Sequence, residues 1–262
     1  MGVIKISSKN NEQIRAVKRL QHKKYRDQTG QFYIEGVRIT EEALPIGLIE
    51  SFFYVPQLLQ TSRGRRLVSR AKSLGFPVYE CTKSTFAEIT DTVTSQGVLA
   101  VLKKPRWVFP PQGLLLVADE IRDPGNMGTI LRTAVGAGVA GLLVVDGSVD
   151  LFNPKVVRSS MGAVFSLPHW FLSREKILEV IKRERISLVV ADLEEAVDYF
   201  NVDFPEKMAL VIGNEAQGVN TQFLRNAALK VKIPLKGPVE SLNASVAAGI
   251  LLYEILRQHR CR

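Results

Sequence analysis

Short, continuous apolar runs that alternate with helical segments are the feature that most constrains the fold, and they dominate the chain after residue 113. Leu114 to Ala118 is the first such run, and an uninterrupted apolar strand is typical of a strand buried on both faces. We expect further strands at 142–145, 188–191, 209–212 and 231–234, and helices at 126–137, 177–185 and 241–258. This alternation predicts a parallel sheet with helices on both faces.

The first hundred residues alternate in the same way, with shorter elements. We expect strands at 32–36, 49–55, 77–80 and 97–102, and helices at 37–44 and 65–74. The stretch from Lys103 to Gln112 has no periodicity and holds three of the twelve prolines, as a linker does. The sequence therefore predicts a small α/β domain over 1–104, a linker over 105–112 and a larger α/β domain over 113–262.

Positive charge is concentrated at the N-terminus. The net charge is +9, and residues 1–26 carry eight Lys and Arg against one acidic residue, Glu12. Ile14, Val17 and Leu20 predict a helix with a narrow apolar stripe, capped by Asn10 or Asn11. A basic helix without large apolar anchors favours nucleic-acid phosphates over a membrane surface, and a merely solvated face is the alternative. The candidate RNA-binding residues are Arg15, Lys18, Arg19, Lys23, Lys24, Arg26 and Arg38.

Several classes of protein are not expected. The sequence has no run of 18 apolar residues, and its N-terminus lacks the apolar core of a secretory signal. The two cysteines, Cys81 and Cys261, are far apart and form no CxxC pair, which argues against a disulfide framework and a zinc ribbon. We therefore expect a cytoplasmic protein with no metal and no membrane partner.

Residues 136–141 read Gly-Ala-Gly-Val-Ala-Gly, which matches the GxGxxG pattern of dinucleotide-binding proteins. That pattern binds a dinucleotide only where it follows a strand and opens a helix. Here the predicted helix comes first and the predicted strand follows. We therefore interpret the glycines as a helix end, and an NAD-dependent oxidoreductase is disfavoured.

Three segments place glycine and polar residues directly after predicted strands: 119–132, 211–219 and 233–245. Ligands bind at the carboxyl ends of strands in open α/β sheets, so these segments are candidate parts of one site. Their candidate functional residues are Asn126, Arg132, Glu215, Ser241 and Asn243. Each also has a purely structural interpretation: a helix or turn cap for Asn126, Glu215 and Ser241, a first-turn residue of the last helix for Asn243, and a helix-surface arginine for Arg132.

The three segments resemble the three signature motifs of the SpoU (TrmH-type) RNA ribose 2′-O-methyltransferases, of the SPOUT class. The resemblance is carried by Asn126 with Arg132, by Ile212-Gly213-Asn214-Glu215 with Gly218, and by Ile233-Pro234-Leu235 followed by Ser241-Leu242-Asn243-Ala244-Ser245. The first domain is similar to the substrate-binding domain of rRNA-modifying members, with a ribosomal-protein-like fold. Phe32-Tyr33-Ile34-Glu35-Gly36 and the helix after it carry that similarity.

The resemblance implies a deep trefoil knot in the second domain, a homodimer, and S-adenosylmethionine bound among the loops of the knot. It implies that Arg132 is catalytic and that Asn126, Glu215, Ser241 and Asn243 shape the site and hold the target nucleotide. The implied cofactor-binding residues are Ala191, Asp192, Ile212, Gly213, Asn214, Gly218, Ile233, Pro234, Leu235, Leu242 and Ser245.

The implied chemistry needs a ribose hydroxyl to lose its proton while it attacks a methyl group. His22, His169 and His259 lie outside all three motifs, so no histidine is offered as a base. Arginine has a pKa of about 12.5 or more, which makes it a poor base. Arg132 could be transiently deprotonated and take the proton, or it could clamp a phosphate and stabilise the alkoxide; the sequence leaves both roles open.

The sequence therefore predicts an RNA ribose 2′-O-methyltransferase. The additional N-terminal domain with its basic helix favours large-subunit, 23S-type rRNA as the substrate. A tRNA substrate is the nearest alternative. A non-catalytic RNA-binding protein is an alternative of another class, and the joint presence of the motif residues argues against it.

Overall fold

The computed structural model describes residues 2–92, 94–109, 113–214 and 216–260. Contacts between Cα atoms divide the chain into two compact units. The first unit extends to Arg106 and also takes in Phe152–Phe165, and the second consists of Trp107–Leu151 and the chain from Ser166 onward. The segment Phe152–Phe165 lies within the span that the sequence assigns to the second domain.

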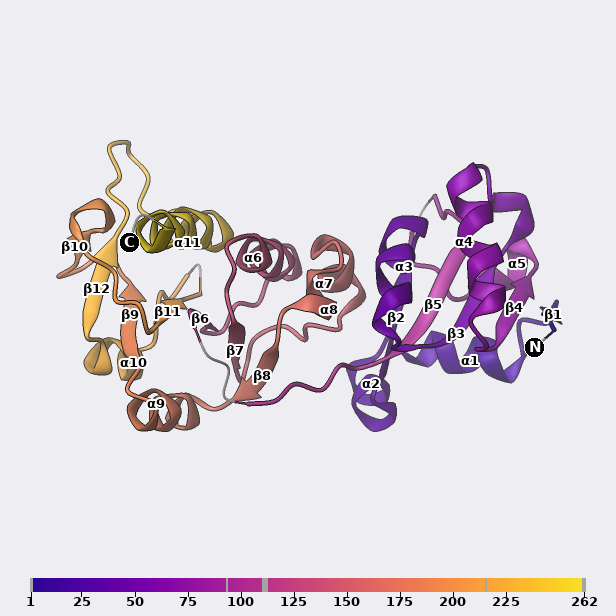
Figure 1. Cartoon of the computed structure of the whole chain (residues 1–262), viewed down its shortest axis with the longest axis horizontal. Coiled ribbons are helices and arrows are strands. Elements are labelled where there is room, and N and C mark those ends of the chain that lie inside the picture. Colours follow the sequence, from indigo (N-terminus) through magenta and orange to yellow (C-terminus); the bar gives the residue numbers. More distant parts are fainter. Residues whose placement is uncertain (1, 93, 110–112, 215, 261–262) are drawn as a thin grey trace. The chain divides into compact units, whose positions relative to one another are not determined.

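The first unit is built on a five-stranded mixed sheet with the strand order β1-β4-β3-β5-β2 (Figure 1). Strand β5 is antiparallel to both of its neighbours, whereas β4 is parallel to β1 and β3. Its strands are β1 (Ile4–Ile6), β2 (Gln31–Glu35), β3 (Ile49–Tyr54), β4 (Val78–Cys81) and β5 (Val98–Lys103). Its helices are α1 (Glu12–Arg19), α2 (Lys23–Thr29), α3 (Val37–Ala43), α4 (Ser62–Ser73), α5 (Lys83–Phe86) and α7 (Pro154–Ser159), with α8 (Ala163–Ser166) at the unit boundary and 3-10 turns at Leu44–Ile46 and Pro56–Leu58.

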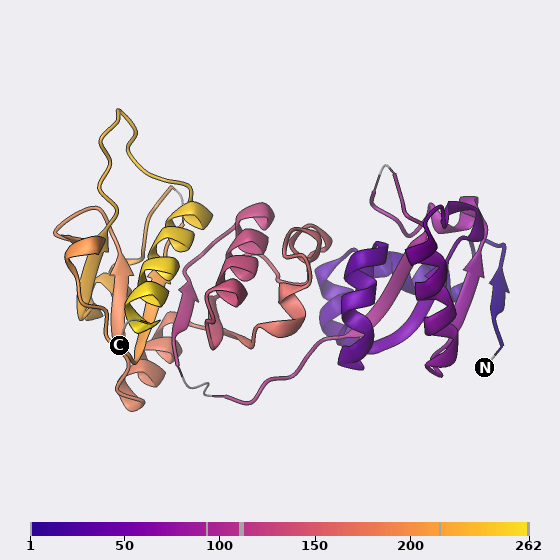
Figure 2. The ribbon, with the colours of Figure 1, turned by 45° about the horizontal axis from the view of Figure 1, so that its top comes forward.

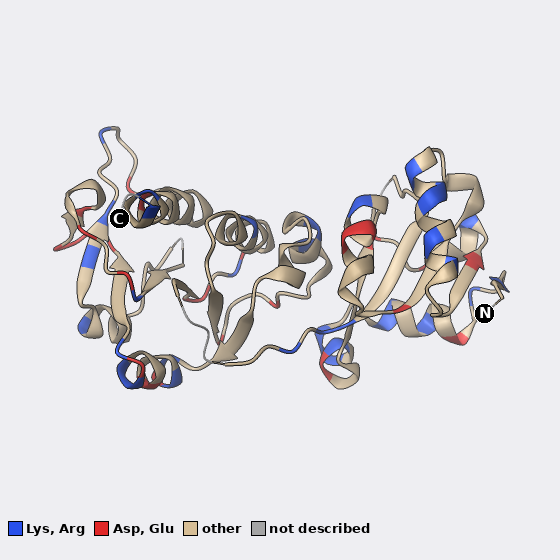
Figure 3. Cartoon of the chain, in the orientation of Figure 1, with Lys and Arg blue, Asp and Glu red and all other residues tan. Residues whose placement is uncertain are grey.

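Helix α1 forms where its capping and apolar residues predict it. The side chain of Asn11 accepts a hydrogen bond from the backbone N–H of Gln13, which fixes the start of the helix. Ile14 and Val17 are buried, and with Leu20 they belong to the core cluster of this unit. The N-terminal segment is therefore an integral part of the first unit. Figure 3 shows Lys and Arg residues on α1, α2, α3 and α4 of this unit.

The second unit contains a seven-stranded sheet with the order β10-β12-β9-β11-β6-β7-β8, in which every pair of neighbours is parallel. Its strands are β6 (Leu115–Ala118), β7 (Gly141–Val145), β8 (His169–Leu172), β9 (Ser187–Ala191), β10 (Val197–Asp198), β11 (Met208–Ile212) and β12 (Leu229–Lys232). Its helices are α6 (Pro124–Gly136), α9 (Arg174–Arg183), α10 (Thr221–Asn226) and α11 (Ala244–Arg260), with a 3-10 turn at Tyr199–Asn201.

Helices cover both faces of this parallel sheet, as the apolar runs predict. Every residue of β6, β7 and β11 is buried. Helices α9 and α10 pack on one face, where Ile177, Ile181 and Phe223 join the core cluster. Helices α6 and α11 pack against each other on the opposite face (Figures 1 and 2). None of the helices in the described part of the chain is long and apolar enough to cross a membrane.

The glycine-rich stretch is a helix end. Helix α6 ends at Gly136 and β7 begins at Gly141, so the helix precedes the strand. A dinucleotide fingerprint needs the reverse order. The last helix also differs from the sequence expectation, because it begins at Ala244 and not at Ser241. The side chain of Asn243 accepts hydrogen bonds from Ser245 N and Val246 N, so Asn243 caps this helix.

Candidate cofactor cavity and active site

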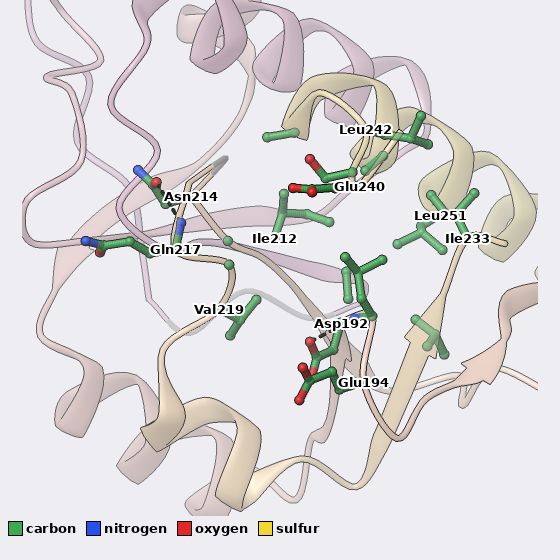
Figure 4. Close-up of a pocket in the computed structure, with 18 of the residues that line it drawn as sticks. Asp192, Glu194, Ile212, Asn214, Gln217, Val219, Ile233, Glu240, Leu242 and Leu251 are labelled. Carbon is green, nitrogen blue, oxygen red and sulfur yellow. Dashed lines mark hydrogen bonds between the residues drawn. The ribbon is translucent and has the colours of Figure 1, made fainter. Parts of the chain in front are cut away.

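A cavity of about 500 Å³ lies at the carboxyl ends of β9, β11 and β12 (Figure 4). Its walls come from the loops after these three strands and from the first turns of α11. Because all the strands are parallel, their carboxyl ends lie at one edge of the sheet. Strand β6 has β7 on one side and β11 on the other, so the order of the strands reverses at β6, next to this cavity. Open α/β sheets bind ligands at such a reversal.

Most of the residues that the sequence assigns to the cofactor line this cavity. These are Ala191, Asp192, Ile212, Gly213, Asn214, Gly218, Ile233, Leu235 and Leu242. Pro234 and Ser245 are not among the lining residues. The hydroxyl of Ser245 instead donates a hydrogen bond of 2.7 Å to Asn243 Oδ1, within the cap of α11. Ser241, assigned to the target nucleotide, is also in the cavity wall.

The turn after β11 requires glycine for steric reasons. A Cβ atom on Gly213 would lie 2.3 Å from the carbonyl carbon of Gly218, too close for any side chain. Gly218 has a φ of +66°, a conformation that favours glycine. Asn214 and Gly218 close the turn with two backbone hydrogen bonds, of 3.1 and 2.9 Å. At Gly213 and Gly218 this turn presents backbone without a side chain to the cavity.

Acidic and apolar side chains share the cavity wall. Asp192 and Glu194 come from the loop after β9, and Glu240 comes from the segment before α11 (Figure 4). Ile212 and Leu251 add apolar surface. Sequence reasoning missed Glu194, Glu240 and Leu251, although Glu240 lies inside the third motif segment and Glu194 lies two residues after Asp192.

An ion-pair cluster around the buried carboxylate of Asp119 holds the loops around the cavity in place. Asp119, at the end of β6, is 1% exposed; it accepts hydrogen bonds from Arg174 Nε at 2.9 Å and from Asn220 N at 2.7 Å. Arg174 also pairs with Glu120, whose backbone oxygen accepts a 2.9 Å hydrogen bond from Asn214 Nδ2. Hydrogen bonds from Arg174 and Arg122 lower the pKa of Glu120 below its ordinary value. The cluster thus connects α9 to Asn214 in the glycine turn and to Asn220 shortly after it.

A side-chain hydrogen bond joins the first and third motif segments. Asn243 Nδ2 donates a 2.8 Å hydrogen bond to Asn126 Oδ1, which joins the start of α6 to the cap of α11. Asn126 is not the cap of α6, because the side chain of Asp123 accepts a hydrogen bond from Asn126 N. Arg132 is exposed on the same helix and does not line the cavity. Glu215 lies outside the described residues.

Comparison with known proteins identifies the family. The sequence model of the SpoU rRNA methylase family matches residues 113–253, and that of the MRM3-like substrate binding domain matches residues 11–100. The chain belongs to the SpoU rRNA methylase family. This SpoU protein is 33% identical over 250 residues to the 23S rRNA (guanosine(2553)-2′-O)-methyltransferase RlmP of Bacillus subtilis, an alignment that covers 95% of the chain and 98% of its relative.

Solved structures support the family assignment over both units. The SpoU protein matches an AdoMet-bound rRNA methyltransferase from Sinorhizobium meliloti with a TM-score of 0.86 and 31% identity, over 98% of each chain. The TrmH/SpoU tRNA modifying enzyme of A. aeolicus matches with a TM-score of 0.50 and 30% identity, over 56% of this chain and 75% of that one. The seven-stranded parallel sheet is therefore that of a SPOUT methyltransferase, and the chain carries an additional N-terminal domain.

The basic residues of the N-terminal segment are used in several different ways in this SpoU protein. Arg26 is only 2% exposed and donates hydrogen bonds to the carbonyl oxygens of Leu20 and Gln21, so it does not reach a surface where it could contact RNA. Other predicted RNA-binding residues have acidic or aromatic partners: Lys18 pairs with Glu88, Lys23 with Asp27, Arg38 with Glu42, and Arg19 lies over the ring of Tyr25. Arg15 and Lys24 are exposed, with no ion pair to any described residue.

Proposed function

We propose that the protein transfers the methyl group of S-adenosylmethionine to the 2′-hydroxyl of a ribose in large-subunit rRNA. One observation carries the proposal: the residues of the second and third motif segments meet in a single cavity whose turn at Gly213 has no room for a side chain. The Asn126–Asn243 hydrogen bond adds the first motif segment to the same edge of the sheet.

The cavity fits S-adenosylmethionine. Its volume of about 500 Å³ is within the range of about 300–1,000 Å³ that small-molecule sites occupy. Ile212, Ile233 and Leu251 offer apolar surface for the adenine, and the bare backbone at Gly213 offers hydrogen-bonding groups. The carboxylates of Asp192, Glu194 and Glu240 complement a ligand with positive sulfonium and ammonium groups. When bound, this cofactor supplies an electrophilic methyl group.

We expect residues of the first motif segment to lie at the reacting ribose hydroxyl. Arg132 is exposed on α6 and lies outside the cavity wall, so its guanidinium is available to RNA. An arginine can bind a phosphate with two parallel hydrogen bonds and can stabilise the negative charge that develops on the ribose oxygen. Asn126 and Asn243 hold each other, which fixes the polar edge against which the nucleotide would lie. Arg132 either clamps the phosphate in this way or takes the proton itself.

The N-terminal unit favours rRNA over tRNA. RlmP of Bacillus subtilis, named for 23S rRNA, aligns over both units of this chain. The A. aeolicus tRNA modifying enzyme covers only 56% of it. We therefore place the substrate-binding role in residues 1–104, joined through a linker at 105–112 to a methyltransferase domain at 113–262. A cytoplasmic location and the trefoil knot are part of the same proposal.

A homodimer is also part of the proposal, and α6 and α11 offer a surface for it. Val135, Val246 and Tyr253 are 40%, 50% and 53% exposed, although they are large apolar residues on two helices that pack together. Val246 and Tyr253 are seven residues apart, hence on one face of α11. Light scattering should give twice the chain mass for the wild type and a lower mass for Val246→Asp; a monomeric wild type would contradict the dimer.

The experiment that tests the activity is methyl transfer in vitro. The purified protein is incubated with methyl-labelled S-adenosylmethionine and either protein-free large-subunit rRNA or bulk tRNA. We expect label in a 2′-O-methylated nucleoside of the rRNA. Label in tRNA alone would move the proposal to the tRNA alternative. Binding of both cofactor and rRNA without transfer would support the non-catalytic RNA-binding alternative.

A further inference from the structure

Helix α4 of the first unit has an unusual composition. Its sequence, Ser-Arg-Gly-Arg-Arg-Leu-Val-Ser-Arg-Ala-Lys-Ser, contains five basic residues and no acidic residue. All five basic residues are exposed, and the helix appears in Figure 3 with several blue bands and no red one. The cationic character of α4 is masked in the sequence totals by acidic residues elsewhere in the first domain.

The buried face of α4 explains why the cations all lie on the other side. Gly64, Leu67, Val68 and Ala71 are the buried residues of the helix. They recur at spacings of three and four residues, so they form one face. The remaining positions are serines and basic residues. The solvent-facing side of α4 is therefore cationic along its whole length and carries no apolar side chain that could insert into a membrane.

Two of the five cations have no partner within the described residues. Arg63 pairs with Glu41, Arg65 Nη1 donates to Leu59 O at 3.1 Å, and Lys72 lies over the ring of Tyr54. The guanidinium groups of Arg66 and Arg70 have neither a hydrogen bond nor an ion pair to any described residue. They are four residues apart, so their Cβ atoms are about 6 Å apart on the same face of the helix.

The cations of residues 1–26 differ from those of α4 in their availability to a ligand. Half of the eight cations there are already paired or buried: Lys9 and Lys18 both pair with Glu88, Lys23 pairs with Asp27, and Arg26 is buried. A cation that is already paired gains less from a phosphate than an unpaired one, because its existing contact must be given up. The unpaired guanidinium groups of α4 carry no such cost.

We propose that the exposed face of α4, centred on Arg66 and Arg70, binds the phosphate backbone of the substrate RNA without regard to base sequence. The inference rests on the proposed function, since it concerns the RNA that the second unit would methylate. Guanidinium groups suit phosphates because their planar donors match two phosphate oxygens at once. RNA is favoured over an anionic membrane because the solvent-facing side of α4 has no apolar anchor.

The test compares two double variants that remove the same charge. Arg66→Gln/Arg70→Gln alters α4, and Lys5→Gln/Lys83→Gln removes two exposed lysines of the same unit whose side chains have no ion pair to any described residue. The dissociation constant for protein-free large-subunit rRNA is measured against salt concentration for the wild type and both variants. For the α4 variant we expect roughly tenfold weaker binding at low salt and a salt slope smaller by about 1.4, since each lost phosphate contact on single-stranded RNA removes about 0.7.

For the matched variant we expect an affinity within about twofold of the wild type, because its cations lie outside the proposed surface. An equal or larger loss in this variant, or an unchanged salt slope in the α4 variant, would overturn the proposal. Thermal unfolding and S-adenosylmethionine affinity should be unchanged in both, which excludes misfolding. Binding of the wild type to phosphatidylserine vesicles that is lost in the α4 variant, with rRNA affinity intact, would assign the surface to a membrane instead.

The two proposals can fail separately. If the wild type binds rRNA through α4 but transfers no methyl group, the methyltransferase activity is wrong and the binding surface stands. If methyl transfer at saturating rRNA is normal while the α4 variant binds like the wild type, the activity stands and the binding surface is wrong.

Discussion

The cofactor cavity of the second unit and the basic surface of the first are specified in different ways. The cavity depends on short, fixed contacts: a turn closed between Asn214 and Gly218, and a buried carboxylate at Asp119. The basic surface depends on long, exposed side chains, and their availability is decided by which acidic residues lie nearby. A motif can therefore reveal the cavity from sequence, whereas a count of charges does not reveal which cations are free to bind RNA.

The largest effect that separates the two regions is expected from Arg132→Ala. Loss of the guanidinium removes transition-state stabilisation, which should slow methyl transfer by at least about a hundredfold. Cofactor affinity should stay within about twofold, because Arg132 is exposed and lies outside the cavity wall. Single-turnover transfer and calorimetric titration measure the two quantities. Wild-type turnover in the variant would remove Arg132 from the catalytic assignment.

A smaller but still large effect is expected from Gly213→Ala. The added methyl group would meet the backbone of Gly218, so the turn must open. Overpacking of this kind costs about 1–3 kcal/mol, and we expect cofactor affinity to fall by roughly ten- to a hundredfold. Gly237→Ala is the matched control, since a Cβ there meets no atom within 4 Å. Equal affinities for the two variants would show that the turn does not shape the cofactor site.

An intermediate effect is expected from Arg174→Met. It removes a cation that pairs with both Asp119 and Glu120, so the loop at Asn214 loses part of its support. We expect S-adenosylmethionine to bind about tenfold more weakly, as is typical when a supporting charge contact is lost. The kcat measured at saturating cofactor should change little. Arg174→Lys should recover part of the affinity.

The outcome that would refute this positioning role is a loss of kcat with cofactor affinity intact. Arg183→Met is the control for removal of a basic residue from α9, because Arg183 is exposed and pairs with its neighbour Glu184 at the surface. That variant should bind the cofactor like the wild type.

The smallest effect concerns acid stability in the first unit. Hydrogen bonds from Lys18 and then Lys9 hold the pKa of Glu88 at about 2, below the ordinary value for glutamate of about 4.3. A depressed folded-state pKa stabilises the fold above the ordinary value, and that contribution is lost as the pH falls from about 4.3 to about 2. Melting temperatures of the wild type and Glu88→Gln should therefore differ at neutral pH and converge in acid.

The double variant Lys9→Met/Lys18→Met tests the stated cause of the Glu88 shift. With both cations removed, replacing Glu88 by glutamine should no longer change the pH dependence of the melting temperature. A difference between the wild type and Glu88→Gln that persists down to pH 2 would mean that the ion pairs do not control this carboxylate.

Much of the fold follows from local pattern. The apolar runs at Leu115–Ala118 and Met208–Ile212 are buried parallel strands, and α1 begins at the cap formed by Asn11. The reversed order around Gly136–Gly141 is also as the sequence indicates. Other boundaries depend on contacts that local pattern does not show. Ser241 and Asn243 are both good capping residues, and only the structure shows that Asn243 caps α11.

The candidate site shows the same division between what local pattern reveals and what it hides. Glycines such as Gly213 can be read from the motif because the backbone requires them. The supporting role of Arg174 could not be predicted from the sequence, because Arg174 lies far from Asp119 along the chain and its helix has an ordinary polar surface. Arg26 looks like any other cation in residues 1–26, and only tertiary burial distinguishes it. Deleting residues 1–26 would also remove Ile14 and Val17 from the core, so charge substitutions are the sounder test of RNA binding.

The most direct test of the account is a map of ribose methylation across total RNA from cells with and without the gene. We predict that a 2′-O-methyl group in large-subunit rRNA disappears when the gene is deleted. It should return with the wild-type gene and not with the Arg132→Ala variant. An unchanged map of rRNA methylation, or a loss confined to tRNA, would contradict the proposal that this SpoU protein methylates large-subunit rRNA.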